Sequence, residues 1–165
     1  MIGMRRIRAK RNGQFQIRLE PPERELLRGL PTQAGVLMDT ERDDPSLLRL
    51  FPNAYPDDAH ANADYKNLVG EELFRHHRQA LDILAETADL TEIDEPQLHQ
   101  WLGALEVLRL VLGTQLDVDE SDRRPPAGDP QSPRYAVYHY LGGLQSEVID
   151  ALAATLPTQS ARSSD

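Results

Sequence analysis

Residues 101–116 read WLGALEVLRLVLGTQL, the most apolar stretch of the chain. Its large apolar side chains recur at steps of three and four residues, the spacing that places them on one face of an α-helix. Val107, Leu110 and Val111 widen this face. A helix with so wide an apolar face is expected to contact other elements on several sides. The pattern therefore predicts that this stretch is the central helix of the core.

Further helices are predicted on both sides of the central one. Asp94 is a suitable cap for the start at Glu95-Pro96, because its carboxylate can accept hydrogen bonds from the first free amides. Pro21-Pro22 predicts the start of an earlier helix, and Pro31 weakens its middle, where a break is possible. A short helical turn at 46–50, a long helix ending near residue 91 and a last helix ending near residue 156 complete the set.

The N-terminal segment, residues 6–19, has the pattern of a β-hairpin. Phe15, Ile17 and Leu19 alternate with polar residues, which predicts a strand with one buried face. Asn12-Gly13 is the dipeptide best suited to the two-residue type I′ turn. Two strands alone are marginal in water, so the hairpin is expected to pack on the helices.

These patterns predict a mainly α fold, in which a short N-terminal β-hairpin packs on a bundle of about four to five helices. The length of 165 residues suits one domain with a proper core. We assign residues 1–157 to this single helical domain. A connector at residues 51–65 is expected to be ordered on the core, a segment at 117–133 to be mobile, and the tail at 158–165 to be disordered.

The charge is strongly acidic but unevenly distributed. A formal net charge of −9 and a pI near 5.0 oppose non-specific attraction to nucleic acid. The basic residues of the N-terminus nevertheless all precede the first acid, Glu20, and they are Arg5, Arg6, Arg8, Lys10, Arg11 and Arg18. We favour a charge-guarded edge strand over phosphate binding, because Phe15 is the only aromatic residue there. Direct nucleic-acid binding is therefore not expected, and a homo-oligomer is left open.

The chain contains no cysteine, which excludes disulfides, thiolate metal sites, thiol nucleophiles and direct thiol redox sensing. No uninterrupted apolar run approaches the roughly 20 residues that a membrane span needs. The basic start at residues 1–11 has no apolar signal core behind it. We therefore expect a cytoplasmic protein with no membrane partner.

Motifs that carry catalysis or bind cofactors are absent from the sequence. No nucleophile elbow, phosphate loop or dinucleotide fingerprint occurs. The expectation is a protein that is not an enzyme, with no catalytic residues and no cofactor. Trp101 could form a platform for a ligand, but a lone tryptophan on an apolar helix face is more often part of the core.

The densest set of metal-ligand side chains is Asp57, Asp58, His60 and Asp64. Hard cations bind several carboxylate oxygens of one loop, yet this spacing does not follow the calcium-binding loop, and no glycine supplies its sharp turn. We expect no metal there. A metal- or anion-binding domain, with a site around the Asp57-Asp58 loop and Arg109, remains the alternative function.

Arg109 is a charged residue within the most apolar stretch. Burying an unpaired guanidinium is costly, so Arg109 needs a partner. Glu106, or an aspartate at 57 or 58, could supply it. We prefer a salt bridge that locks the 51–65 connector onto the central helix, and anion binding is the second interpretation.

Several short segments together resemble a known family. They are LFPNAYPDD at 50–58, Asp64-Tyr65, Trp101-Leu102, LRLVLGT at 108–114, Tyr140-Leu141 and Leu144-Gln145. Their order and spacing are similar to those of an actinobacterial family labelled as a domain of unknown function, whose described members are AosR-type oxidative-stress regulators. The resemblance covers nearly the whole chain.

This resemblance implies a non-enzymatic regulatory or adaptor protein that acts on transcription through protein contact, with a stress sigma factor as the candidate partner. The structural or partner-site candidates are Tyr55, Asp57, Asp58, Tyr65, Trp101 and Arg109. The chain departs from the family in two respects. It lacks the cysteines on which the redox-sensing members depend, and it has Gln115 where the family pattern suggests a second arginine.

Overall fold

The computed structural model describes residues 5–50, 59–116, 128, 130 and 132–156, and their side chains except at 48 and 59–69. The helices are α1 (Pro21–Thr40), the 3₁₀ helix η1 (Pro45–Leu50), α2 (Ala59–Thr87), α3 (Glu95–Gln115) and α4 (Ser132–Ala153). The strands are β1 (Ile7–Ala9), β2 (Phe15–Ile17) and β3 (Glu92–Ile93). The prediction of a mainly helical fold with a small N-terminal β structure is confirmed.

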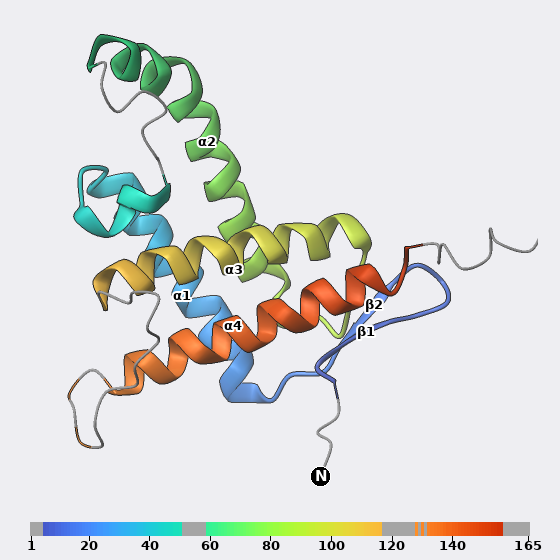
Figure 1. Ribbon diagram of the computed structural model, residues 1–165. Coiled ribbons are helices and arrows are strands. Elements are labelled where there is room, and N and C mark those ends of the chain that lie inside the picture. Colours follow the sequence, from blue (N-terminus) through green and yellow to red (C-terminus); the bar gives the residue numbers. More distant parts are fainter. Residues whose placement is uncertain (1–4, 51–58, 117–127, 129, 131, 157–165) are drawn as a thin grey trace, which may run out of the picture.

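Helix α3 lies at the centre of the molecule. It packs against α2, α4 and η1, and α1 packs against α2. Figure 1 shows α4 running beside α3 while α1 crosses behind both. The α3 residues that are buried are Leu98, Trp101, Ala104, Leu105, Val107, Leu108, Val111 and Gly113. The prediction that residues 101–116 form the central helix is therefore confirmed.

The start of α3 is fixed by the predicted cap. Asp94 has an extended backbone, and its Oδ1 accepts a hydrogen bond of 2.8 Å from the Gln97 amide. The Gln97 side chain accepts one of 2.9 Å from the Asp94 amide in return. This reciprocal pair satisfies two of the backbone amides that a helix leaves free at its start. Helix α3 consequently begins at one defined residue, Glu95.

Three strands form an antiparallel sheet in the order β1-β2-β3. The register places Ile7 opposite Ile17 and Phe15 opposite Ile93. These four side chains are buried and join the helical core. The sheet therefore has one strand more than the predicted hairpin. Strand β3 escaped prediction because it has only two residues and shows no alternation.

The turn between β1 and β2 differs from the predicted type I′ turn. The Lys10 amide donates to the Gln14 carbonyl at 2.8 Å, so the loop contains the three residues 11–13. Gly13 has a φ of 82°, the left-handed conformation that favours glycine. The Asn12 side chain accepts a 3.0 Å bond from the Gln14 amide. A three-residue loop that ends on such a glycine is another common hairpin turn.

Helix α1 is unbroken through Pro31, so the break considered at its middle is absent. Pro31 is buried together with Leu27, Ala34 and Met38. A proline inside a helix costs a backbone hydrogen bond. The burial of this face against the core offsets that cost, because several large side chains leave water along the same stripe.

Arg24, on the first turns of α1, joins three segments of the backbone. Its guanidinium donates to the carbonyls of Ile17 and Leu19 at 3.3 and 3.2 Å. It also donates to those of Ala88 and Leu90 at 2.8 and 2.9 Å, just after α2 ends. A single side chain thus connects the end of β2 to the turn between α2 and β3.

Some predictions fall outside the described residues. Most of the 51–65 connector and of the 117–133 segment, and the whole 158–165 tail, lie there. The assignment of residues 1–157 to one domain stays a prediction. Within the described part of the chain, no helix is both long enough and apolar enough to cross a membrane.

Candidate functional site

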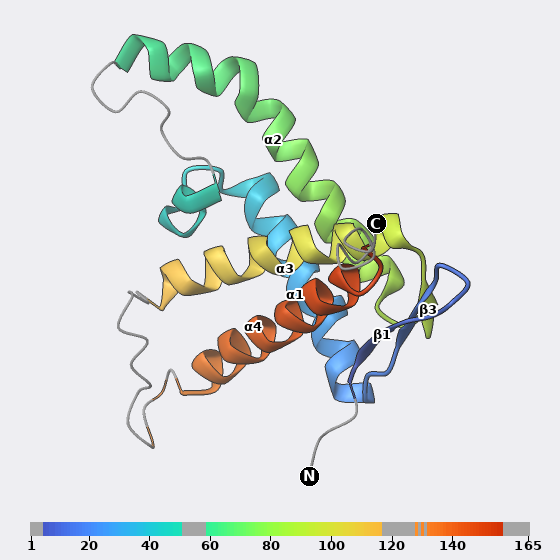
Figure 2. The same cartoon turned by 45° about the vertical axis from the view of Figure 1, so that its right-hand side comes forward.

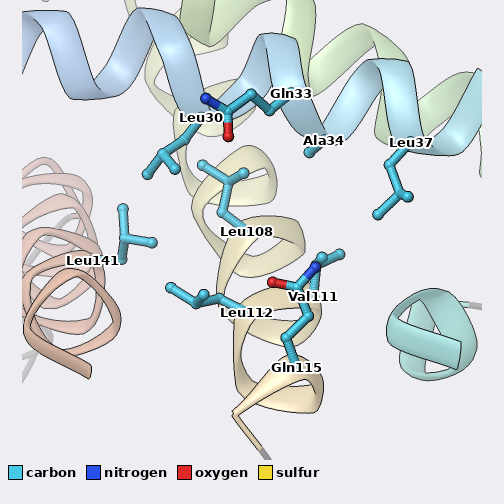
Figure 3. Close-up of a pocket in the computed structure, with 9 residues that line it drawn as sticks. All are labelled: Leu30, Gln33, Ala34, Leu37, Leu108, Val111, Leu112, Gln115 and Leu141. Atoms are coloured by element: carbon cyan, nitrogen blue, oxygen red, sulfur yellow. The ribbon is translucent and has the colours of Figure 1, made fainter. Parts of the chain in front are cut away.

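A groove lies between α1 and α3, and we call it the α1–α3 groove. It has a volume of about 110 Å³. Figure 3 shows α1 side chains on one side, α3 side chains on the other, and Leu141 of α4 at one end. The lining residues are Leu30, Gln33, Ala34, Leu37, Leu108, Val111, Leu112, Gln115 and Leu141.

The chemistry of the groove is that of an apolar surface. Seven of its nine lining residues are apolar, and the other two, Gln33 and Gln115, are exposed amides. No lining side chain titrates in the physiological range, so the groove itself offers no general acid or base. Its volume is well below the roughly 300 Å³ at which small-molecule sites begin. It suits an apolar side chain better than a cofactor.

Arg109 lies beside this groove, between α3 and α4. Its Nη1 donates to Gln145 Oε1 at 2.7 Å, and its Nη2 lies 3.5 Å from the Tyr138 hydroxyl. The guanidinium carbon is 5.1 Å from the centre of the Tyr138 ring, within range of a cation–π interaction. The Arg109 Nε is buried without a hydrogen-bond partner. The positive charge of Arg109 is therefore contacted by neutral groups of α4.

Glu106 reaches Arg109 only through Gln145. The Gln145 Nε2 donates to Glu106 Oε2 at 2.7 Å, while the oxygen of the same amide accepts from Arg109. The predicted direct pair of Glu106 and Arg109 is thus replaced by a bridge through an α4 amide. Asp57 and Asp58 lie outside the described residues, so the salt bridge to the connector stays a prediction.

Glycine on α4 allows this close approach. A Cβ at Gly142 would lie 3.4 Å from Arg109 Nε, at the limit of ordinary contact. A Cβ at Gly113 of α3 would lie 3.2 Å from Cε2 of Tyr138, which is tighter. Gly142 is therefore a point of close packing between α4 and Arg109. A Cβ at Gly143 would meet nothing within 4 Å.

A second charged cluster holds β1 on the helices. Arg6 Nε lies 2.6 Å from Glu23 of α1, and its Nη1 lies 2.9 Å from Glu147 of α4. The Arg6 amide also donates to Glu147 at 2.8 Å. The Arg6 guanidinium lies 5.4 Å from the centre of the Tyr140 ring. Two carboxylates from different helices thus share one arginine.

The pKa values in this cluster reflect both burial and charge. Burial acts to raise the pKa of Glu23, but the Glu20 amide, the Arg6 guanidinium and the Tyr140 hydroxyl outweigh it and hold the pKa below its ordinary value. Burial raises the pKa of the Tyr140 hydroxyl far above its usual range, and the Glu23 carboxylate adds to this effect. At neutral pH the cluster therefore holds an ionised Glu23 carboxylate beside a neutral Tyr140 hydroxyl.

The structure describes only part of the predicted site. Trp101 is fully buried, and its Nε1 donates to Thr87 Oγ1 at 2.7 Å, so it belongs to the core. Tyr65 lies in α2, but its side chain is not among those described, and Tyr55 lies outside the described residues with the two aspartates. Over the side chains that the structure describes, no group of three or more potential metal ligands occurs.

Sequence reasoning missed the partners of the two helix-packing arginines. On α4, Tyr138 and Gln145 are seven residues apart and share one side of the helix, whereas Tyr140 and Glu147, also seven apart, share another. Their distance in sequence from Arg6 and Arg109 hides the contacts. A search for polar residues on the core side of α4 would have identified these partners.

Comparisons with known proteins place the chain in a family. Residues 4–152 match the family described as "Domain of unknown function (DUF2017)". The match covers most of the chain, so the chain belongs to this family. No solved structure matches the chain.

Relatives within the family have names that refer to oxidative stress. A Mycobacterium leprae protein named "Putative oxidative stress regulator AosR" is 35% identical over 68% of this chain and 60% of its own length. The Mycobacterium tuberculosis protein named "Oxidative stress regulator AosR" is 29% identical over 64% of this chain and 57% of its own length. The chain thus spans less than two thirds of the relatives that it matches.

Proposed function

We propose that this protein regulates the response to oxidative stress, without catalysis, by contact with another protein of the transcription machinery. The observation that carries the proposal is kinship with proteins named oxidative stress regulators. A stress sigma factor is the candidate partner. The chain has no cysteine, so it does not respond to oxidation through thiols of its own.

The α1–α3 groove supports a contact role. An apolar groove with a neutral polar rim resembles the anchor pockets of protein interfaces, in which one large side chain of the partner is desolvated. Leu30, Leu37 and Leu112 are each partly exposed there, although they belong to the apolar face of the bundle. We propose that an apolar side chain of the sigma factor occupies the groove.

A pair of variants tests the groove without disturbing the core. Gln33→Trp with Gln115→Trp would fill the mouth of the groove, and both positions are exposed. Gln79→Trp, on an exposed position of α2, is the matched control. Tagged protein should recover a sigma factor from peroxide-treated cells. The amount of sigma factor recovered with the groove variant should fall at least about tenfold, which corresponds to a loss of roughly 1.4 kcal/mol in binding free energy. The control should recover as much as the wild type.

A deletion strain tests the wider proposal. Loss of the gene should lower survival under peroxide, and the wild-type chain should restore it. Normal survival in the deletion strain, together with no recovery of any transcription component, would contradict the regulatory function. Recovery of a sigma factor that the groove variant leaves unchanged would contradict only the assignment of the groove.

A further inference from the structure

The outer surface of the N-terminal hairpin carries a concentrated positive charge. We call Arg5, Arg8, Lys10, Arg11 and Arg18 the basic hairpin surface, because all five are exposed. The chain has no acidic residue from position 5 to position 19, although its net charge is −9. This surface is therefore of opposite sign to the rest of the protein.

Part of this charge is neutralised within the fold. Lys10 pairs with Glu92 of β3 at 2.8 Å. Among the described residues, no hydrogen-bond or ion-pair partner is found for Arg5, Arg8 or Arg11. Arginines of the helical body mostly have one, as Arg28 does with Asp89 at 2.7 Å. The arginines without a partner among the described residues therefore lie in a segment of the sequence that contains no acidic residue.

The strands direct these cations outward. Ile7 is buried in the core, so the alternation of a strand places its neighbour Arg8 on the opposite, solvent face. Arg8 lies opposite Gln16 in the register, and no carboxylate occupies that position. Arg11 belongs to the loop between β1 and β2, which Figure 2 shows at the edge of the molecule, away from α2. A large partner can therefore reach Arg8 and Arg11.

We propose that the basic hairpin surface binds an acidic segment of a partner protein. Guanidinium groups pair with carboxylates through two parallel hydrogen bonds, so exposed arginines suit runs of aspartate and glutamate. The surface is separate from the α1–α3 groove, so the two contacts can be measured independently.

Nucleic acid fits this surface less well. Three unpaired cations would release few counterions, with a salt slope of only about −3 on B-DNA. The acidic body opposes the approach of a long polyanion. Phe15 is 1% exposed, so no aromatic ring of the hairpin strands is available to stack on a base. Binding of a short acidic peptide does not depend on the release of many counterions, and the peptide is too short to be repelled strongly by the acidic body. It also needs no aromatic ring to stack on.

The contact between the basic hairpin surface and the partner should mainly speed association and orient the partner. Ion pairs between exposed side chains contribute little to affinity and are screened by salt. Complementary charge nevertheless raises association rates and fixes the orientation of a partner. Binding is therefore expected to be strongest at low salt and to weaken at least about tenfold at physiological ionic strength of roughly 0.15 M.

A labelled peptide of alternating glutamate and glycine is the probe, and fluorescence anisotropy on the full chain is the measurement. The Arg8→Gln/Arg11→Gln variant should lower the affinity at least about fivefold at low salt. Arg75→Gln/Arg134→Gln is the matched control, because it removes the same charge from exposed helical positions. Circular dichroism checks that both variants keep the helical fold.

Three results would overturn the assignment. They are no binding of the acidic peptide at low salt, an equal loss in both variants, or tighter binding of a DNA duplex of the same formal charge that depends on Arg8 and Arg11. The last result would assign the surface to nucleic acid. None of them bears on the sigma-factor contact at the groove.

Discussion

Two arginines pack against α4 in similar surroundings but with different partners. Arg6 and Arg109 are both partly exposed, and their guanidinium groups lie 5.4 and 5.1 Å from the centres of the Tyr140 and Tyr138 rings. Arg6 is paired with two carboxylates, whereas Arg109 is bound by an amide and approached by a hydroxyl. One side of α4 is thus held to β1 by charge, and another side is held to α3 by neutral hydrogen-bonding groups.

The largest effect is expected for Arg6→Met. The substitution keeps an unbranched side chain in place of the aliphatic part of arginine. It leaves Glu23 and Glu147, which are only 18% and 21% exposed, close together without their cation. Removing one partner of such a cluster should lower the free energy of unfolding by about 2–3 kcal/mol, less than for a fully buried pair. Urea denaturation measures this loss. A change below about 0.5 kcal/mol, typical of surface substitutions, would contradict the role of the cluster.

Arg109→Met should cost less, about 1 kcal/mol, because the lost hydrogen bond to Gln145 is partly offset by removal of the buried, unpaired Nε. The same denaturation measurement applies. A loss as large as that of Arg6→Met would show that Arg109 has an anionic partner in solution. In that case the contrast between the two sides of α4 would fail.

The two arginine clusters should also differ in how they make stability depend on pH. The pKa of Glu23 lies below its ordinary value of 4.5, so its stabilisation is fully present above that pH and is lost as pH falls through the lowered folded-state pKa. Melting temperatures measured from pH 6 downward should therefore fall less steeply in Glu23→Gln than in the wild type. Arg109→Met should keep the wild-type slope. Equal slopes in all three proteins would contradict the prediction.

The smallest effect concerns adjacent glycines on α4. Gly143→Ala should raise the free energy of unfolding by up to about 1 kcal/mol, because alanine favours a helix and the new methyl group meets nothing. Gly142→Ala should gain less, because its methyl group would contact the Arg109 guanidinium. Thermal denaturation of both variants tests this difference. Equal gains would indicate that Arg109 is free to move aside.

Local signals in the sequence predicted most of the fold. Asp94 before Glu95-Pro96 fixed the start of α3 because capping depends on neighbours a few residues apart. Pro31 did not break α1, because burial of its face outweighs a local backbone cost. Strand β3 is defined by its pairing with β2, and a two-residue strand has no periodicity of its own to detect.

The candidate site was harder to predict. The cost of burying Arg109 correctly indicated that it needs partners, and an acid was the obvious choice. The structure uses Gln145, 36 residues away, to bridge Arg109 and Glu106. Nothing local to residue 109 encodes that choice, since it depends on how α4 lies on α3. The α1–α3 groove likewise exists only once three helices are assembled.

Arg24 has a consequence for how substitutions are tolerated. The atoms that it binds are backbone oxygens of residues 17, 19, 88 and 90, which every amino acid possesses. Side-chain changes at those four positions leave the acceptors in place. The hydrogen bonds of this junction can therefore be removed by a side-chain substitution only at Arg24 itself, whereas substitutions at Ile17 or Ala88 would act through the packing of the core.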